Sequence, residues 1–164
     1  MKTVSVAEAI KADGLRIVIV QAMPSPWGVA AKAMIEHKSL DYVCAYQIPM
    51  SDNPELLAWA GTNSAPVVAW NDEPPINSWE DILLLLERLV PDPRLVPENM
   101  AERIEVFGIC REICGEVGFG WNRRIDLARP PAGEEPGPFA QKYNYRHTEA
   151  AVANERVVAL MAEL

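Results

Sequence analysis

The sequence predicts an α/β unit with the element order β-α-β-α-β-β-α, followed by an all-helical segment. A continuous β-branched run at residues 16–21 is typical of a strand buried on both faces, as in parallel sheets. Strand-like and helical patterns alternate as far as residue 90, and after Pro97 only the helical pattern continues. A strand–helix–strand unit followed by a hairpin and a closing helix gives a four-stranded mixed sheet with helices on both faces.

Composition excludes several classes of protein. The 164 residues are 49% hydrophobic and 23% charged, which are globular values. A net charge of -8 without a run of basic residues argues against nucleic acid and anionic membrane surfaces as partners. No segment approaches the roughly 20 apolar residues that a membrane span needs. Three cysteines without a C-x-x-C motif argue against a disulfide scaffold and a metal site, so we expect a reducing, cytoplasmic setting.

Local signals place the first elements. A short helix is expected at residues 4–12, where Asp13-Gly14 ends it, and a strand follows at 16–21. Ser25 is then a favourable N-cap residue, and Pro26 occupies the first position of a helix at 26–37.

The remaining elements of the α/β unit follow from apolar runs and turn residues. Ser78 is expected to cap the closing helix, with Asp81 in an approximate capping box, and the leucines of that helix pack on the sheet. The other elements are strands at 40–48 and 66–70, a stub of a fourth strand at 76–77, and a short helix at 54–60.

The second half of the chain has helical periodicity. Residues 98–129 carry one apolar stripe, which Gly115, Gly118 and Gly120 interrupt, so we expect a kink or a close approach there. A loop at 130–138 precedes a final amphipathic helix that Thr148 caps and in which the sequence ends, at Leu164.

Three short motifs resemble segments of a known family. Residues 25–28 (Ser-Pro-Trp-Gly) open a helix after a buried strand. Residues 63–68 (Asn-Ser-Ala-Pro-Val-Val) precede residues 76–78 (Ile-Asn-Ser), and the distance between these two motifs also matches the family. On these motifs the chain resembles the cytosolic glutathione S-transferase superfamily, in its bacterial type with a serine at the start of the first family helix.

The resemblance implies a two-domain fold. It places an N-terminal extension at 1–15 and a thioredoxin-like, glutathione-binding domain at 16–92. An all-α glutathione-transferase C-terminal domain follows at 98–164. The family's later helices have no counterpart here, so this domain is expected to be incomplete. Family habit also implies a homodimer.

The resemblance also implies a glutathione site. Ser25 would be the catalytic hydroxyl beside the thiol, and Ala65, held by a cis bond to Pro66, would pair with the cysteinyl backbone of glutathione. Asn77 and Ser78 would receive the γ-glutamyl carboxylate, although asparagine is one methylene shorter than the family's usual residue. The candidate pocket for the second substrate, a small hydrophobic electrophile, consists of Trp27, Trp121 and Arg124. Glutathione is the co-substrate, and no metal is expected.

Two functions remain open at this level. The first is a glutathione transferase, in which the glutathione thiolate adds to the electrophile. The alternative is a non-catalytic glutathione-transferase-like module for binding or assembly. Ser25 can equally be a plain helix cap, and Cys110 and Cys114 are expected to be buried, inert thiols. A thiol–disulfide oxidoreductase is disfavoured because residues 22–25 contain no cysteine.

Overall fold

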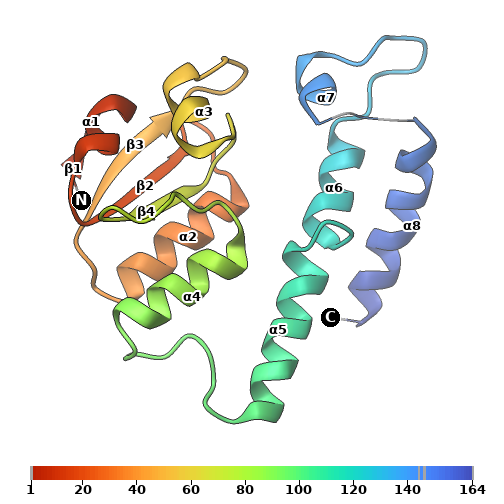
Figure 1. Cartoon of the computed structure of the whole chain (residues 1–164). Coiled ribbons are helices and arrows are strands. Elements are labelled where there is room, and N and C mark those ends of the chain that lie inside the picture. The colour runs from red at the N-terminus through yellow and green to blue at the C-terminus, as the bar shows by residue number, and fades with distance from the viewer. Residues whose placement is uncertain (1, 144, 146, 164) are drawn as a thin grey trace. The chain divides into compact units, whose positions relative to one another are not determined.

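A computed structural model describes residues 2–143, 145 and 147–163, with the backbone alone at 147–149 and 151. The chain divides into two compact units, residues 1–95 and 96–164. The described part of the first unit forms a sheet with helices on both faces (Figure 1). Its elements are β1 (Lys2–Thr3), α1 (Val6–Lys11), β2 (Leu15–Val20), α2 (Pro26–His37), β3 (Tyr42–Gln47), α3 (Pro54–Ala60), β4 (Val67–Trp70) and α4 (Trp79–Leu89).

The sheet has the strand order β1-β3-β2-β4. The central strand β2 pairs parallel with β3 and antiparallel with β4, so the predicted mixed sheet is confirmed. The expected stub of a fourth strand at 76–77 is reduced to one residue, because Ile76 forms a single antiparallel bridge with Val68. Two prolines precede Ile76 and a helix cap follows within two residues, which leaves no length for a strand.

The fourth strand is instead β1, which pairs parallel with the outer side of β3. Residues 2–15 therefore belong to the sheet and its covering layer rather than extending from the domain. The buried Arg16 helps to hold them, because its guanidinium donates to the carbonyl of Ala12 at 2.7 Å and to that of Asn71. The sequence pattern marked Arg16 only as the start of an apolar strand.

Two apolar clusters cover the two faces of the sheet. On one face, α2 and α4 pack on the central strands, and on the other face α1 and α3 do so (Figure 1). The first cluster is the larger. Its fully buried members include Ile17, Ile35, Cys44, Val68, Ile82 and Leu86.

The described part of the second unit is helical, and at the glycines where a kink or close approach was expected the helical segment 98–129 is broken. The break is a turn in which the N–H of Gly118 donates to the carbonyl of Gly115 at 2.9 Å. A Cβ at Gly118 would lie 2.7 Å from the carbonyl oxygen of Glu112, so the close approach requires glycine. The helices are α5 (Met100–Cys114), α6 (Phe119–Leu127), α7 (Pro138–Lys142) and α8 (His147–Glu163).

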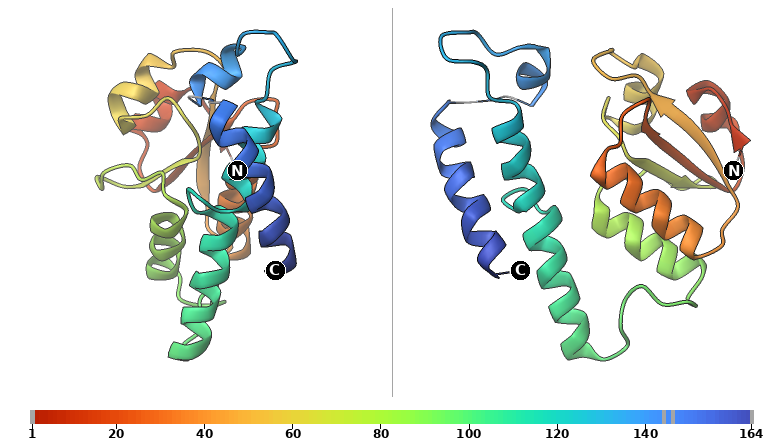
Figure 2. Two further views of the ribbon diagram at one scale, coloured as in Figure 1. Left: turned by 90° about the vertical axis from the view of Figure 1, so that its right-hand side faces the viewer. Right: turned by 180° about the vertical axis from the view of Figure 1, so that it is seen from behind.

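The helix α8 runs back along α6 (Figure 2). An ion pair of 2.6 Å between Arg156 of α8 and Glu112 of α5 adds a second link. The helix α7 was not predicted. The side-chain cap expected at Thr148 and the chain end at Leu164 lie outside the described residues. None of the described helices has both the length and the apolar composition needed to span a bilayer.

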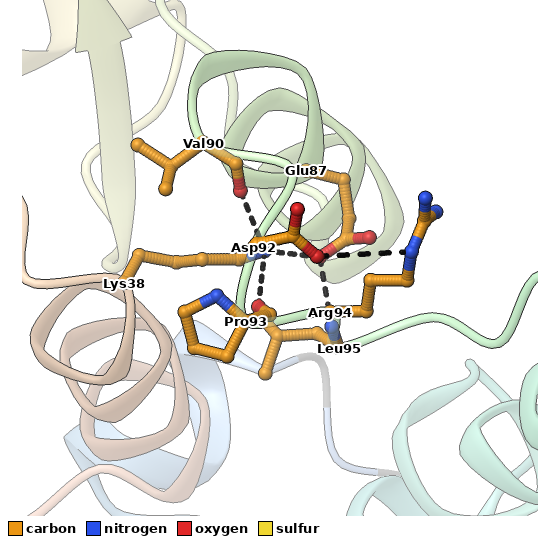
Figure 3. A network of polar contacts seen from close by, with 7 residues as sticks. All are labelled: Lys38, Glu87, Val90, Asp92, Pro93, Arg94 and Leu95. Carbon is orange, nitrogen blue, oxygen red and sulfur yellow. Dashed lines mark hydrogen bonds and ion pairs between the residues drawn. The ribbon is translucent and has the colours of Figure 1, made fainter.

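A buried ammonium group fixes the end of the first unit (Figure 3). Lys38, directly after α2, has a fully buried side chain. Its Nζ donates to the carboxylate of Glu87 in α4 and, at 2.7 Å each, to the carbonyls of Val90 and Pro93. The same Glu87 oxygen accepts the N–H of Leu95 at 2.8 Å. This Lys38 network therefore binds the segment after α4 to both helices beneath the sheet.

We expect Lys38→Met to lower the free energy of unfolding by about 3–5 kcal/mol, because it leaves a partly buried carboxylate and two carbonyls without their cation. The matched control is Lys32→Met, which removes a surface pair with Glu36 and should cost no more than about 0.5 kcal/mol. Urea unfolding measures both values. Equal losses in the two variants would contradict a structural role for the Lys38 network.

Candidate functional site

The strand register brings the predicted glutathione-site residues of the first unit to one end of the sheet. Ser25 follows the carboxyl end of β2, where Val18 pairs with Val67. Because β4 is antiparallel to β2, the residues before Val67, which are Ala65 and Pro66, lie beside the end of β2 that leads to Ser25. The bridge between Ile76 and Val68 places Asn77 and Ser78 at this same end.

Ser25 occupies the N-cap position of α2, but its hydroxyl makes no hydrogen bond to the first turn. Its carbonyl accepts the N–H of Val29 at 2.8 Å, so only the backbone takes part in the helix start. Ser25 is therefore the N-cap residue that was predicted, but its side chain does not cap the helix, and the residue is half-buried at the helix N-terminus. The loop before it contains Ala22 at φ 57°, a left-handed conformation that costs a residue with a Cβ free energy.

Ser78 differs from Ser25 because its hydroxyl is used by the helix. Its Oγ accepts the N–H of Asp81 at 3.1 Å, which confirms the predicted cap of α4. The first turn also carries the carboxylates of Glu80 and Asp81. Negative charge at a helix N-terminus is favourable for the helix but reduces the attraction for a further anion. Asn77, immediately before, is exposed.

Ala65 offers backbone groups at the edge of the sheet. The peptide bond between Ala65 and Pro66 is cis. No backbone hydrogen bond joins the N–H or C=O of Ala65 to another described residue. The bridge from Ile76 occupies the outer edge of β4 only at Val68. In the preceding turn Gly61 ends α3 in a left-handed conformation, at φ 68°.

The three residues predicted for the electrophile pocket belong to different units. Trp27 is half-buried in the first turn of α2, whereas Trp121 and Arg124 lie on α6. The Arg124 guanidinium carbon lies 4.2 Å from the centre of the Trp121 ring and 4.3 Å from that of Tyr143. Sequence reasoning missed Tyr143, because its position depends on α7.

The three cysteines are free thiols. Cys44 is buried in β3 as expected, but Cys110 and Cys114 are only half-buried because α5 buries none of its residues. Burial raises the pKa of each of the three thiols, so they are protonated at neutral pH. Within the described residues, no group of three or more His, Cys, Asp or Glu side chains could hold a metal ion.

Comparison with solved structures identifies the fold. A glutathione S-transferase from Methylobacterium radiotolerans JCM 2831, complexed with glutathione sulfonate, matches 91% of this chain with a TM-score of 0.63 and 19% identity. A glutathione transferase family member from Pseudomonas fluorescens Pf-5, with two glutathione bound, matches 97% with a TM-score of 0.68 and 17% identity. One from Methylobacillus flagellatus KT, with glutathione bound, matches 92% with a TM-score of 0.70 and 12% identity.

The chain has the glutathione S-transferase fold. Its first unit is the thioredoxin-like domain and its second is the helical domain, so the predicted fold class is confirmed. The chain spans 64%, 69% and 68% of the lengths of these three structures, respectively. No protein-family model matches the sequence, and neither does any curated protein.

The two serines of this glutathione S-transferase fold should differ in their effect on stability. We expect Ser78→Ala to lower the free energy of unfolding by about 1 kcal/mol, because it removes a cap hydrogen bond. Ser25→Ala should change it by less than about 0.5 kcal/mol, because no cap bond is lost. Thermal and urea unfolding of both variants test this difference, and a larger loss for Ser25→Ala would restore the cap interpretation.

Proposed function

We propose that this chain binds glutathione and acts as a glutathione transferase on a small hydrophobic electrophile. One observation carries the proposal. A hydroxyl that its helix does not use, a backbone edge without a strand partner and a helix N-terminus lie at the same end of one sheet, at Ser25, Ala65 and Ser78. Glutathione has a thiol, a peptide backbone and a carboxylate, for which these are suitable partners.

Binding would begin with the peptide backbone. The cysteinyl part of glutathione would lie antiparallel to Ala65 and use its N–H and C=O, as peptides do when they add to a sheet edge. The γ-glutamyl carboxylate would approach Ser78, whose O–H can still donate while its oxygen accepts the N–H of Asp81. The glutathione present in the neighbours from Pseudomonas fluorescens and Methylobacillus flagellatus supports this choice of ligand.

Two features would weaken the γ-glutamyl contact. Glu80 and Asp81 already place negative charge in the first turn of α4. Asn77 has a shorter reach than the glutamate or glutamine that the resemblance leads us to expect. We therefore propose weak to moderate affinity, which backbone contacts largely supply.

Catalysis would depend on the Ser25 hydroxyl. By donating its O–H to the glutathione sulfur, it would stabilise the thiolate and lower the pKa of the thiol. The thiol proton passes to solvent as the thiolate forms. The thiolate sulfur would then form a bond to an electrophilic carbon, and either a leaving group departs with its bonding electron pair or a π bond opens to an anion that takes a proton from solvent. Trp27, two residues further into α2, is the proposed apolar contact for the electrophile beside Ser25.

The alternative is a non-catalytic binding or assembly module. The acidic first turn of α4 and Asn77 favour it, because both oppose tight glutathione binding. The Ser25 hydroxyl favours the enzyme, because a plain helix cap would bond the first turn. The two functions therefore differ in whether the thiol of bound glutathione is ionised.

We expect glutathione bound to the wild type to show its ultraviolet thiolate signal at lower pH than free glutathione. Ser25→Ala should move this transition up by about one to two pH units, because a hydrogen bond to a charged group is worth about 1.5–3 kcal/mol. Affinity, measured by calorimetry, should change little, because backbone contacts supply it.

The control is Ser51→Ala, in an exposed loop, which should titrate like the wild type. Glutathione binding without a thiolate signal at any pH would favour the binding module. Identical titration of the wild type and Ser25→Ala would leave Ser25 without a catalytic role.

We also propose a homodimer and a cytoplasmic location, in which the three cysteines would remain thiols. Soluble monomers rarely expose large apolar patches. On α5, four aliphatic side chains are between 40% and 66% exposed, and they form two pairs spaced four residues apart. They are Met100, Ile104, Ile109 and Ile113.

We expect multi-angle light scattering to give twice the chain mass for the wild type and a lower mass for Ile104→Asp, which places a charge in the exposed pair Met100 and Ile104. Val158→Asp, at an equally exposed position on α8, is the matched control and should remain dimeric. A monomeric wild type at micromolar concentration would contradict the dimer.

A further inference from the structure

The direction of the peptide proposed above fixes where each end of glutathione lies. The segment that follows Ile76 is antiparallel to β4, so it runs from its bridge with Val68 toward the beginning of β4 and brings Ser78 to the Pro66 side of Ala65. A tripeptide antiparallel to Ala65, with its γ-glutamyl end at Ser78, therefore has its glycyl end beside the residues that precede Ala65.

The residues that precede Ala65 offer polar groups without charge. Residues 61–64 are Gly-Thr-Asn-Ser, and the last three of them are half-buried. The Thr62 hydroxyl oxygen accepts the N–H of Ser64 at 3.1 Å, and its O–H can still donate to a ligand. A carboxylate placed here would lose part of its water without gaining a cation, which costs free energy.

The surrounding sequence adds negative charge only. Residues 39–87 contain no lysine, arginine or histidine, although they include β3, α3, β4 and the start of α4. Asp52 and Glu55 follow the carboxyl end of β3, and Glu80 and Asp81 lie in the first turn of α4, so all four belong to the same end of the sheet as Ala65. Glutathione has two carboxylates and one ammonium group, so this end of the sheet repels it.

The strand register places basic residues of the first unit at the opposite end. Lys2 pairs with Val43, and Arg16 pairs with Ala69. That end lies roughly 15 Å along β4 from Ala65, beyond the screening length of about 8 Å at physiological salt.

The helices carry the remaining basic residues of this unit away from Ala65. Arg88, in the last turn of α4, pairs at 2.6 Å with Glu73 in the turn that follows β4. Lys32, midway along α2, pairs with Glu36 at 3.1 Å. The others precede β2 or β3 or follow α4, and they are Lys11, His37, Lys38 and Arg94.

We propose that this site prefers a thiol tripeptide with an uncharged C-terminal group, such as the amide of glutathione, to glutathione itself. The inference rests on the proposed function, because it takes the cysteinyl backbone to lie on Ala65. The amide keeps the γ-glutamyl and cysteinyl contacts. At the glycyl end it presents a carbonyl oxygen and N–H donors, which Thr62 and its neighbours can satisfy without a cation.

The test is isothermal titration of the full chain with glutathione and with glutathione amide. We expect the wild type to bind the amide about tenfold more tightly, because a carboxylate loses more on partial desolvation than an amide does. Ser64→Lys, which supplies a cation at the glycyl end, should tighten glutathione about tenfold and leave the amide nearly unchanged. The matched control is Thr3→Lys, which adds the same charge at an exposed position of β1 and should bind both peptides as the wild type does.

A second measurement needs no variant, so it also covers the case in which Ser64→Lys does not fold. Raising the salt concentration from 0.05 to about 0.5 M should strengthen glutathione binding about threefold and leave the amide unchanged, because salt screens the repulsion. Glutathione that binds as tightly as the amide or more tightly, or that salt weakens, would overturn this preference and leave the proposed function intact. Failure of both peptides to bind would contradict the proposed function itself, and the preference with it.

Discussion

The hydrogen-bond register of β2 with its two neighbours is the constraint from which the candidate glutathione site follows. Parallel pairing with β3 and antiparallel pairing with β4 fix β2 along its whole length, and both of its faces are buried. A shift by one residue would turn its core side chains to the opposite face, so the register has no low-cost alternative. With that register fixed, Ser25 and Ala65 must lie at the same end of the sheet, although forty positions separate them in the sequence.

The two serines at this end have opposite relations to their helices. Ser78 satisfies an N–H of its own helix, so its hydroxyl serves stability first, and the carboxylates of Glu80 and Asp81 already complement the helix dipole. Ser25 leaves its hydroxyl unused by the helix, in a loop where Ala22 has a disfavoured backbone conformation. An unused polar group and local strain at one place are more readily explained by a ligand than by folding.

Charged side chains stabilise each unit in a way that apolar patterning does not reveal. In the first unit, the Lys38 ammonium donates hydrogen bonds to one carboxylate and two carbonyls. A buried cation needs such a full set of partners in place of the water that it has lost. In the second unit, the Arg124 guanidinium lies against the rings of Trp121 and Tyr143.

The sequence alone determined the bounds of those helices that begin or end at a proline or a glycine. The helix α2 was predicted with its observed bounds, because the proline at its first position fixes φ there. The end of α3 follows in the same way from a glycine that takes the left-handed conformation. Tertiary structure decided the rest. The two-residue strand β1 exists only because β3 offers an open edge. The partners of Lys38 are distant in sequence, and so is the Tyr143 ring that Arg124 contacts. The residue type and its spacing identify a serine at the start of a helix, but they do not determine where its side chain lies. Whether the hydroxyl caps the helix is therefore decided by the tertiary structure.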